Sequence, residues 1–299
     1  MTDTSARQDL PAMTATDAPQ GGRTLPIRAL ATAALLLAVM AVVYVFLYLP
    51  IVHIGLSSIA KNHTFPYPPR LTGKAFADLF GNQLYQRALG NSILLGFGSA
   101  LVTVTMTTMA TIGVIRFAGR RARYFVVLFV APLFVAEVLV GISSLVFSGL
   151  FLGLPGNLGS AILANSVHCF SYALLIIATQ LFRYDWRLDE AATVFGATPV
   201  QTFREVTLPL IWPGLMGAFL ISFILSFNNL EISFYLLGAT PTLPSVAWGA
   251  LRYGVKPELF ALATLVNLVV IAILIAMYLA MARGIAKFGH RPERQRAVG

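Results

Sequence analysis

Residues 186–209 read WRLDEAATVFGATPVQTFREVTLP. The first half of this stretch has the signals of a short helix. Asp189 and Glu190 are acidic, and acidic side chains stabilise a helix N-terminus. Gly196 follows a run of helix-compatible residues and can adopt the left-handed conformation that closes a helix. We therefore predict a first helix that ends at this glycine.

A second helix is predicted directly after the glycine. Thr198 is a good N-cap, and Gln201 completes a Thr-x-x-Gln capping box with it. Pro199 stands at the first helical position, where proline is favoured. Pro209 is expected to end this helix, so the stretch should fold as a helix–turn–helix and not as a linker.

The first of these helices has a face of small residues, Ala191, Ala192 and Gly196. Such a face lets another surface approach closely. The same face would also suit a helix pair that rests against the rest of its own chain. The residues alone leave both interpretations open.

The composition places this loop in a membrane protein. Of the 299 residues, 57% are hydrophobic and 11% are charged. An average soluble domain has about 45–50% apolar and about 25% charged residues. So little charge cannot cover a water-soluble globule of this size, and we infer that the chain is solvated largely by lipid.

Six stretches are long and apolar enough to cross a bilayer, which takes roughly 20 residues. They are residues 29–51, 88–115, 124–148, 158–181, 211–237 and 259–282. The first is longer than the apolar core of about 7–15 residues of a signal peptide, so we expect a retained span. Between the first two spans, residues 75–89 have the pattern of one short interfacial helix.

The basic residues set the expected orientation. Fifteen of the 21 Lys and Arg residues fall in the two termini and the loops after spans two and four. The positive-inside rule puts these segments in the cytoplasm, and it explains the net charge of +9 without nucleic acid. We expect a disordered tail over 1–27, a transmembrane domain over 28–285 and a basic tail over 286–299, with the loop at 183–209 cytoplasmic.

The loop resembles the EAA loop of binding-protein-dependent ABC importer permeases. The shared pattern is Glu190-Ala191-Ala192, then Gly196 and, after nine intervening residues, Val206-x-Leu208-Pro209. In that family the first helix of the loop docks in a cleft of an ATPase subunit. The resemblance implies that the docking residues are Asp189, Glu190, Ala191, Ala192, Gly196, Leu208 and Pro209.

Further motifs resemble the spermidine/putrescine (PotC-like) branch of this family. They are Gly90-Asn-Ser-Ile-Leu94, Pro132-x4-Glu137-Val-x2-Gly141, the segment 226–233 and Thr242-Leu-Pro244. The resemblance implies the type I (MetI-like) permease fold with six transmembrane helices, and a polyamine-like solute. This branch often carries acidic residues where this chain has Asn228 and Asn229, so an amino-acid derivative, an opine or an aminophosphonate stays open as the solute.

Two carboxylates, Glu137 and Glu231, fall inside predicted spans. A charge near the bilayer centre costs roughly 2.5–3.5 kcal/mol on insertion scales, so such a residue needs a partner or a water-filled cavity. We assign Glu137, Asn228, Asn229 and Glu231 to a candidate substrate pathway that favours a cation. Structural hydrogen bonds between helices remain the alternative.

No phosphate-binding loop, metal-ligand spacing or catalytic constellation occurs in the sequence. The resemblance therefore implies a non-catalytic subunit with no cofactor of its own. Its partners would be a second permease, two ATPase subunits that bind ATP and Mg²⁺, and an extracytoplasmic solute-binding protein, all at a bacterial inner membrane. A self-sufficient secondary transporter and an intramembrane enzyme are the competing classes.

Overall fold

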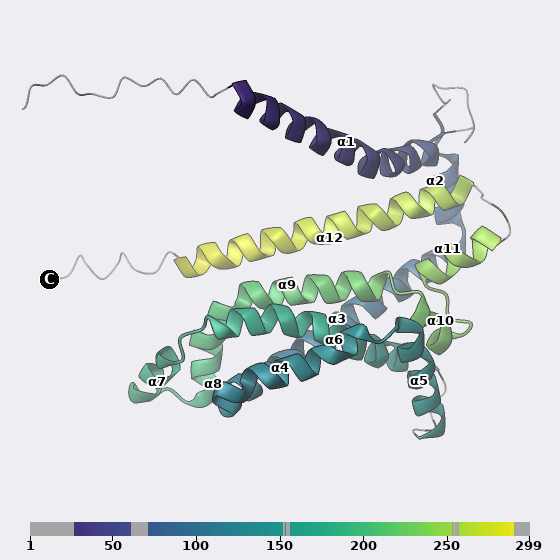
Figure 1. Cartoon of the computed structure of the whole chain (residues 1–299). Helices are drawn as coiled ribbons and strands as arrows, with labels where there is room; N and C mark the ends of the chain where they lie inside the picture. Colours follow the sequence, from purple (N-terminus) through teal and green to yellow (C-terminus); the bar gives the residue numbers. More distant parts are fainter. Residues whose placement is uncertain are drawn as a thin grey trace, which may run out of the picture. The chain divides into compact units, whose positions relative to one another are not determined.

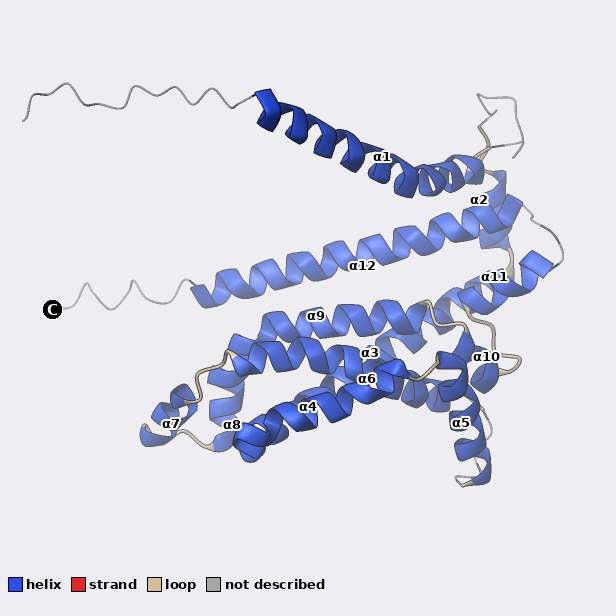
Figure 2. Cartoon of the chain, viewed as in Figure 1, coloured by secondary structure: helices blue, strands red, loops and turns tan. Residues whose placement is uncertain are grey.

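The computed structural model describes residues 27–60, 71–151, 153, 156–252, 254 and 257–289. Within these ranges the regular elements are helices and no strand is formed (Figure 1, Figure 2). The chain divides into two units, Met1–Val52 and His53–Gly299, and each is described by itself. The predicted all-α fold is confirmed.

Among the described residues, five helices and one bent pair are long and apolar enough to cross a membrane. The five helices are α1 (Ile27–Ser58), α3 (Gln83–Ala118), α6 (Leu158–Phe182), α9 (Leu208–Phe227) with the segment before it, and α12 (Pro257–Gly289); the pair is α4 (Ala122–Val130) with α5 (Glu137–Leu150). These correspond to the six predicted spans.

The described part of the first unit, residues 27–52, belongs to α1, and the end of this helix falls in the second unit. The segment Ala31–Ser58 is 28 residues long, which at about 1.5 Å per residue exceeds the hydrocarbon thickness of about 30 Å. Pro50 lies inside the helix. The first predicted span is thus a full membrane-length helix.

Three helices, α3, α6 and α9, pack along one another at the centre of the second unit (Figure 1). Small hydroxyl side chains line the contact between α3 and α6. Ser99 and Thr103 donate across it to the carbonyls of Ile162 and Ser166, each at 3.3 Å, and Ser166 donates back to the carbonyl of Ser99 at 3.2 Å. Small residues that allow close backbone approach and hydrogen bonds between helices are typical of packing inside lipid.

The third predicted span is not one straight helix. The chain bends by 93° between the segment Ala122–Phe134 and α5, and Figure 1 shows α5 turning away from α4. A short 3₁₀ helix with Pro132 follows α4, and Ala136 is then extended, with φ −62° and ψ 137°. The helix restarts at Glu137. The prediction of a continuous helix over 124–148 is wrong because proline withholds a backbone donor at this point.

The fifth predicted span is interrupted as well. α9 ends at Phe227, and α10 (Glu231–Leu237) begins after a break. Asn228 donates its side-chain amide to the carbonyl of Ile224, and Asn229 accepts the N–H of Ile232 at 2.9 Å. Asparagine side chains that bond to nearby backbone groups compete with the helix ladder. The expected single helix over 211–237 therefore stops at this pair.

The predicted interfacial helix over 75–89 is also divided. α2 (Lys74–Gly81) ends at Asn82, which is extended and accepts the N–H of Leu84 with its side chain at 2.9 Å. This N-cap begins α3. A short polar residue with an accepting oxygen is the usual start of a helix, and hydropathy alone did not reveal it.

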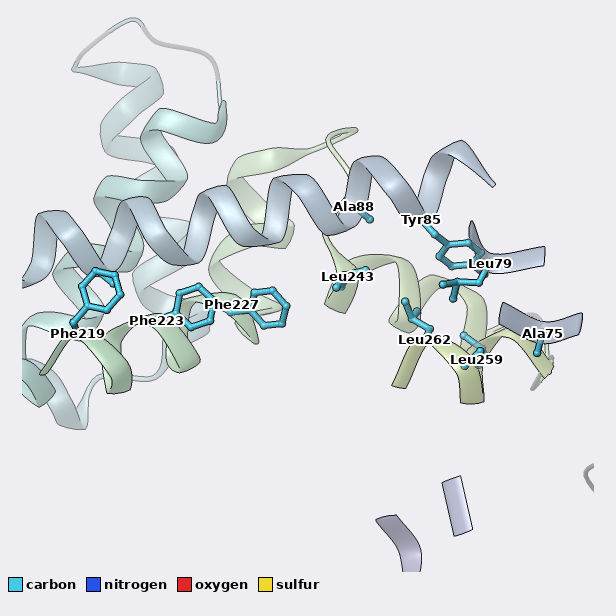
Figure 3. Packing of buried hydrophobic residues seen from close by; sticks show 12 residues of the cluster. Ala75, Leu79, Tyr85, Ala88, Phe219, Phe223, Phe227, Leu243, Leu259 and Leu262 are labelled. Atoms are coloured by element: carbon cyan, nitrogen blue, oxygen red, sulfur yellow. The ribbon is translucent and has the colours of Figure 1, made fainter. Parts of the chain in front are cut away.

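An apolar core joins α2, α3, α12 and α11 (Leu243–Arg252), a helix that the sequence did not predict. Leu79, Tyr85, Leu243, Leu259 and Leu262 gather there (Figure 3). The hydroxyl of Ser92 accepts the N–H of Leu243 at 2.8 Å, so the start of α11 is fixed to α3. This core holds the last span beside the central helices.

Most of the predicted tails lie outside the described residues. Ile27 is the first residue of α1, and residues 286–289 belong to the end of α12. Residues 61–70, between α1 and α2, also lie outside the described ranges.

Candidate functional site

The loop at 186–209 begins as the sequence predicts. α7 (Arg187–Val194) ends just before Gly196, whose φ is +83°. Thr198 accepts the N–H of Gln201 with its hydroxyl at 3.3 Å, and the Gln201 side chain accepts the N–H of Thr198 at 2.8 Å. This capping box opens α8 (Pro199–Thr202). The left-handed glycine and the capping box are confirmed.

The end of the loop differs from the prediction. A short π-helix, η3 (Phe203–Thr207), connects α8 to α9, so that residues 199–227 form one continuous helix. Pro209 therefore does not end a helix. It stands in the first turn of α9, next to a widened turn in which Leu208 bonds back to Phe203. A residue that cannot donate is tolerated in such a position.

One side of α7 is open to its surroundings. Glu190 and Ala191 are exposed, and Val194 and Phe195 are 84% and 90% exposed. Gly196 completes this surface, which we name the outer face of the loop. Two large apolar side chains exposed together outside the membrane-spanning helices are typical of a surface that meets another protein.

The remaining predicted docking residues lie elsewhere. Ala192 is half-buried beside the outer face, and Leu208 and Pro209 are half-buried in the first turn of α9. Leu208 packs with Ile211 in the core of α6 and α9. Asp189 is only 4% exposed. The accessible part of the predicted set is thus Glu190, Ala191, Gly196 and part of Ala192.

Asp189 faces the ends of the spans that lie next to the loop. Its Oδ1 accepts hydrogen bonds from the hydroxyls of Tyr184 and Thr207, at 2.5 and 3.1 Å. Its Oδ2 lies 3.9 Å from a guanidinium nitrogen of Arg116. Arg116 also lies over the ring of Trp186, 5.8 Å from its centroid. The acidic residue before Glu190 is therefore a buried junction and not part of the exposed surface.

The phenol of Tyr184 is held in its neutral form by this arrangement. Burial raises the pKa of Tyr184 from 10.0 to about 12, and the hydrogen bond to Asp189 adds to the rise. A phenol that donates to a carboxylate cannot ionise without losing that bond and placing two negative charges side by side. Tyr184 therefore serves as a donor at every ordinary pH.

Glu137 is the centre of a second polar cluster, inside the membrane-spanning region. The side-chain amide of Asn229 donates to its Oε2 at 2.7 Å. Nε2 of His168 lies 3.3 Å from its Oε1, within ion-pair distance but without hydrogen-bond geometry. The His168 side chain is 4% exposed, whereas that of Glu137 is 37% exposed. The carboxylate is thus held from one side and open on another.

The other two predicted pathway residues are placed differently. Glu231 is half-buried at the first residue of α10. Asn228 is exposed and lines an apolar cavity of about 410 Å³ between α9, α11 and α12, together with Leu243 and Asn267. Among these four residues, the described structure joins Glu137 and Asn229 directly by a hydrogen bond.

Sequence reasoning missed the partners of both carboxylates. Nothing in the sequence linked His168 to Glu137, or Tyr184, Thr207 and Arg116 to Asp189. None of these residues stands out in its local sequence. Only the tertiary structure shows that each lies close to a carboxylate. Asp189 and Glu190 are consecutive acidic residues of one predicted helix and cannot share a face, which is a local signal that one of them needs a partner.

The sequence was compared with known proteins. The family described as binding-protein-dependent transport system inner membrane component matches residues 118–287. That segment contains the loop, Glu137 and Asn229. The chain belongs to this family.

The permease is similar to two curated polyamine permeases. It is 31% identical over 248 residues to the putrescine transport system permease protein PotI of Escherichia coli (strain K12), covering 80% of this chain and 88% of that protein. It is 28% identical over 244 residues to the spermidine/putrescine transport system permease protein PotC of Haemophilus influenzae, covering 80% and 93%.

Among solved structures, a bacterial ABC transporter involved in the import of the acidic polysaccharide alginate has the same fold. The TM-score is 0.66 at 20% identity, over 86% of this chain and 96% of that chain. The predicted type I importer fold is therefore confirmed. The permease is a multi-pass inner-membrane subunit of a binding-protein-dependent ABC importer, and it is not an enzyme.

Proposed function

We propose that this permease moves a small, polyamine-like cation inward by alternating access, driven by separate ATPase subunits. It would pair with a second permease subunit and bind two ATPase copies, which hold ATP and Mg²⁺. An extracytoplasmic binding protein would deliver the solute. The pathway stays closed on the outer side until the loaded binding protein docks.

The Glu137 cluster is the observation that carries this proposal. A carboxylate has about four acceptor positions, and one of them takes the hydrogen bond from Asn229. His168 approaches the other oxygen from its buried side. The exposed part of the carboxylate remains open to a further donor. An ammonium group offers three donors and a compensating positive charge, so a cationic solute fits this site.

The ATPase would dock on the outer face of the loop. Glu190 and Ala191 are exposed there, beside the protruding side chains of Val194 and Phe195. The small residues permit close approach, and the apolar pair supplies area to bury. This assignment places the loop at 183–209 and both termini in the cytoplasm, in agreement with the distribution of basic residues.

The names of the two curated relatives support a polyamine as the solute. The amides of Asn228 and Asn229 favour the alternative of a less highly charged solute, such as an amino-acid derivative, an opine or an aminophosphonate. Asn229 does not weaken the acidic character of the site directly, because it donates to Glu137 and does not replace it.

Uptake by the reconstituted transporter tests the proposal. The complete complex in proteoliposomes, with its binding protein and labelled putrescine or spermidine outside, should show ATP-dependent uptake. Glu137→Gln keeps the shape of the side chain and removes its charge, so it should lower uptake at least about tenfold. Asp78→Asn, which removes an exposed carboxylate on α2, is the matched control.

Two results would contradict the proposal. If the Glu137→Gln complex takes up solute at the parent rate, at equal protein level, then Glu137 is not part of the pathway. Uptake of a neutral or anionic solute with no transport of either polyamine would replace the proposed solute class.

A further inference from the structure

The carboxylate of Asp189 is a meeting point of four elements. Asp189 itself belongs to α7, and Tyr184 follows the end of α6. Thr207 is the last residue of the π-helix that continues into α9, and Arg116 lies in the last turn of α3. Residues at the end of α3, just after α6 and just before α9 therefore all contact one side chain of the loop.

This carboxylate is well satisfied, although it is buried. Its side chain is 6% exposed, and a buried charge is stable only with close partners and good hydrogen bonds. Two hydroxyls occupy Oδ1, and the guanidinium of Arg116 lies near Oδ2. Removing the charge leaves Arg116 without its acidic neighbour at this junction, and removing the carboxylate altogether also deprives both hydroxyls of their acceptor.

The adjacent residue points the other way. Glu190 is exposed on the outer face, whereas Asp189 is buried against Tyr184 and Thr207. Two acidic residues that are neighbours in the sequence thus face different parts of the molecule. A partner that binds the outer face would displace α7. The contacts of Asp189 would transmit this displacement to the spans.

We propose that Asp189 is a positioning residue that couples the docking helix to α3, α6 and α9 and does not itself touch the ATPase. This rests on the proposed docking of an ATPase on the outer face. A packed junction with discrete hydrogen bonds transmits displacement as a unit. Loss of the junction leaves α7 able to bind a partner while its movement no longer reaches the pathway.

The test is the ratio of solute transported to ATP hydrolysed in the complete transporter. Asp189→Asn keeps the shape and an acceptor for the two hydroxyls, and Asp189→Ala removes both. Asp185→Asn is the matched control, because Asp185 is an exposed carboxylate of the same loop that accepts the N–H of Arg187, and asparagine caps equally well. ATPase retention, ATP hydrolysis and uptake are measured on the same proteoliposomes.

We expect the Asp189→Ala complex to retain both ATPase copies and to transport about tenfold less solute per ATP. Asp189→Asn should show a smaller loss, and Asp185→Asn should match the parent. If Asp189→Ala does not assemble, Thr207→Val removes one donor without touching α7, and the same fall in transport per ATP is expected at a smaller size.

Three results would overturn the inference. The first is an unchanged ratio of solute transported to ATP hydrolysed in Asp189→Ala. The second is loss of the ATPase subunit from Asp189→Ala with a normal ratio in the complexes that remain, which would make Asp189 a contact residue. The third is an unchanged ratio in Thr207→Val where Asp189→Ala fails to assemble. Failure of the proposed function looks different, because the parent and Asp185→Asn would then also lack a bound ATPase or ATP-dependent uptake.

Discussion

Asn229 donates a hydrogen bond of 2.7 Å to Glu137, although 92 positions separate the two residues in the sequence. Glu137 is the first residue of α5, and Asn229 lies in the break before α10. The bond therefore ties together the points at which two interrupted spans restart. Interrupted helices in transporters place polar groups at a solute pathway inside the membrane.

Replacing Asn229 should lower both the thermal stability of the complex and its rate of uptake. Asn229→Ala removes the donor to Glu137 and the acceptor for the N–H of Ile232. A buried polar group that loses its partner costs about 1–3 kcal/mol, so we expect a lower melting temperature of the detergent-solubilised complex and slower uptake. Thermal unfolding followed by intrinsic fluorescence measures the first effect.

The neighbouring amide is the control for this change. Asn228 is exposed, and its side chain bonds back to the carbonyl of Ile224 in its own helix. Asn228→Ala should change stability by no more than about 0.5 kcal/mol, as is usual for surface positions. Equal effects of the two substitutions would show that the bond to Glu137 does not matter.

The close approach of α5 and α10 depends on Gly141. A Cβ at this position would stand 2.9 Å from Cδ2 of Tyr235 and 3.2 Å from the backbone Cα of Ile232. Gly141→Ala should therefore push the two helices apart and destabilise the protein by about 1–3 kcal/mol. The change is measured as a fall in melting temperature of the purified complex.

Gly149 lies in the same helix and provides the comparison. Among the described residues, no atom outside its own helix backbone stands within 4 Å of a Cβ at Gly149. Gly149→Ala should be neutral or stabilising by about 0.5–1 kcal/mol, because alanine favours the helix. A destabilisation of similar size at both glycines would argue against close packing at Gly141.

The contact between Tyr184 and Asp189 has a spectroscopic signature. Burial and the hydrogen bond to Asp189 raise the pKa of Tyr184 to about 12, above its usual value of 10.0. The folded state favours the neutral phenol, so this contribution to stability is complete below pH 10 and is lost as the pH rises from 10 to 12.

An ultraviolet titration of phenolate absorbance measures this pKa directly. The difference between the parent and Tyr184→Phe should contain one tyrosine that ionises near pH 12. Asp189→Asn removes the negative charge and should move that ionisation to lower pH. A difference spectrum that titrates near pH 10 in the parent would show that the phenol is not held by the carboxylate.

Local chemistry in the sequence predicted the local structure well. Gly196 closes α7, and Thr198 with Gln201 caps α8, because each signal acts within four residues. Apolar length likewise located the six spans. These features depend on interactions between near neighbours along the chain or on contact with lipid, and both are visible in one sequence.

The breaks within the spans could not be read from hydropathy. The segments around Ala136 and Asn228 are apolar enough to count as continuous helix. The missing backbone donor of Pro132 interrupts the first, and the side-chain hydrogen bond of Asn228 interrupts the second. The inward orientation of Asp189 was hidden for a related reason. Its donor Thr207 is 18 positions away, and Arg116 lies on a different span.

The left-handed turn at Gly196 gives the last prediction. Gly196 donates to the carbonyl of Thr193 at 2.9 Å, and Ala197 donates to the carbonyl of Ala192 at 3.0 Å, which closes α7. The φ of Gly196 is +83°, so Gly196→Ala should cost about 1–2 kcal/mol in local backbone strain even though the site is open. The turn should loosen, α7 should exchange its amide hydrogens faster, and less ATPase should co-purify with the permease.

Gly90→Ala, at an open position inside α3, should leave both measurements unchanged. Unaltered hydrogen exchange in α7 with a full complement of ATPase in the Gly196→Ala complex would mean that the glycine does not set the shape of the docking surface.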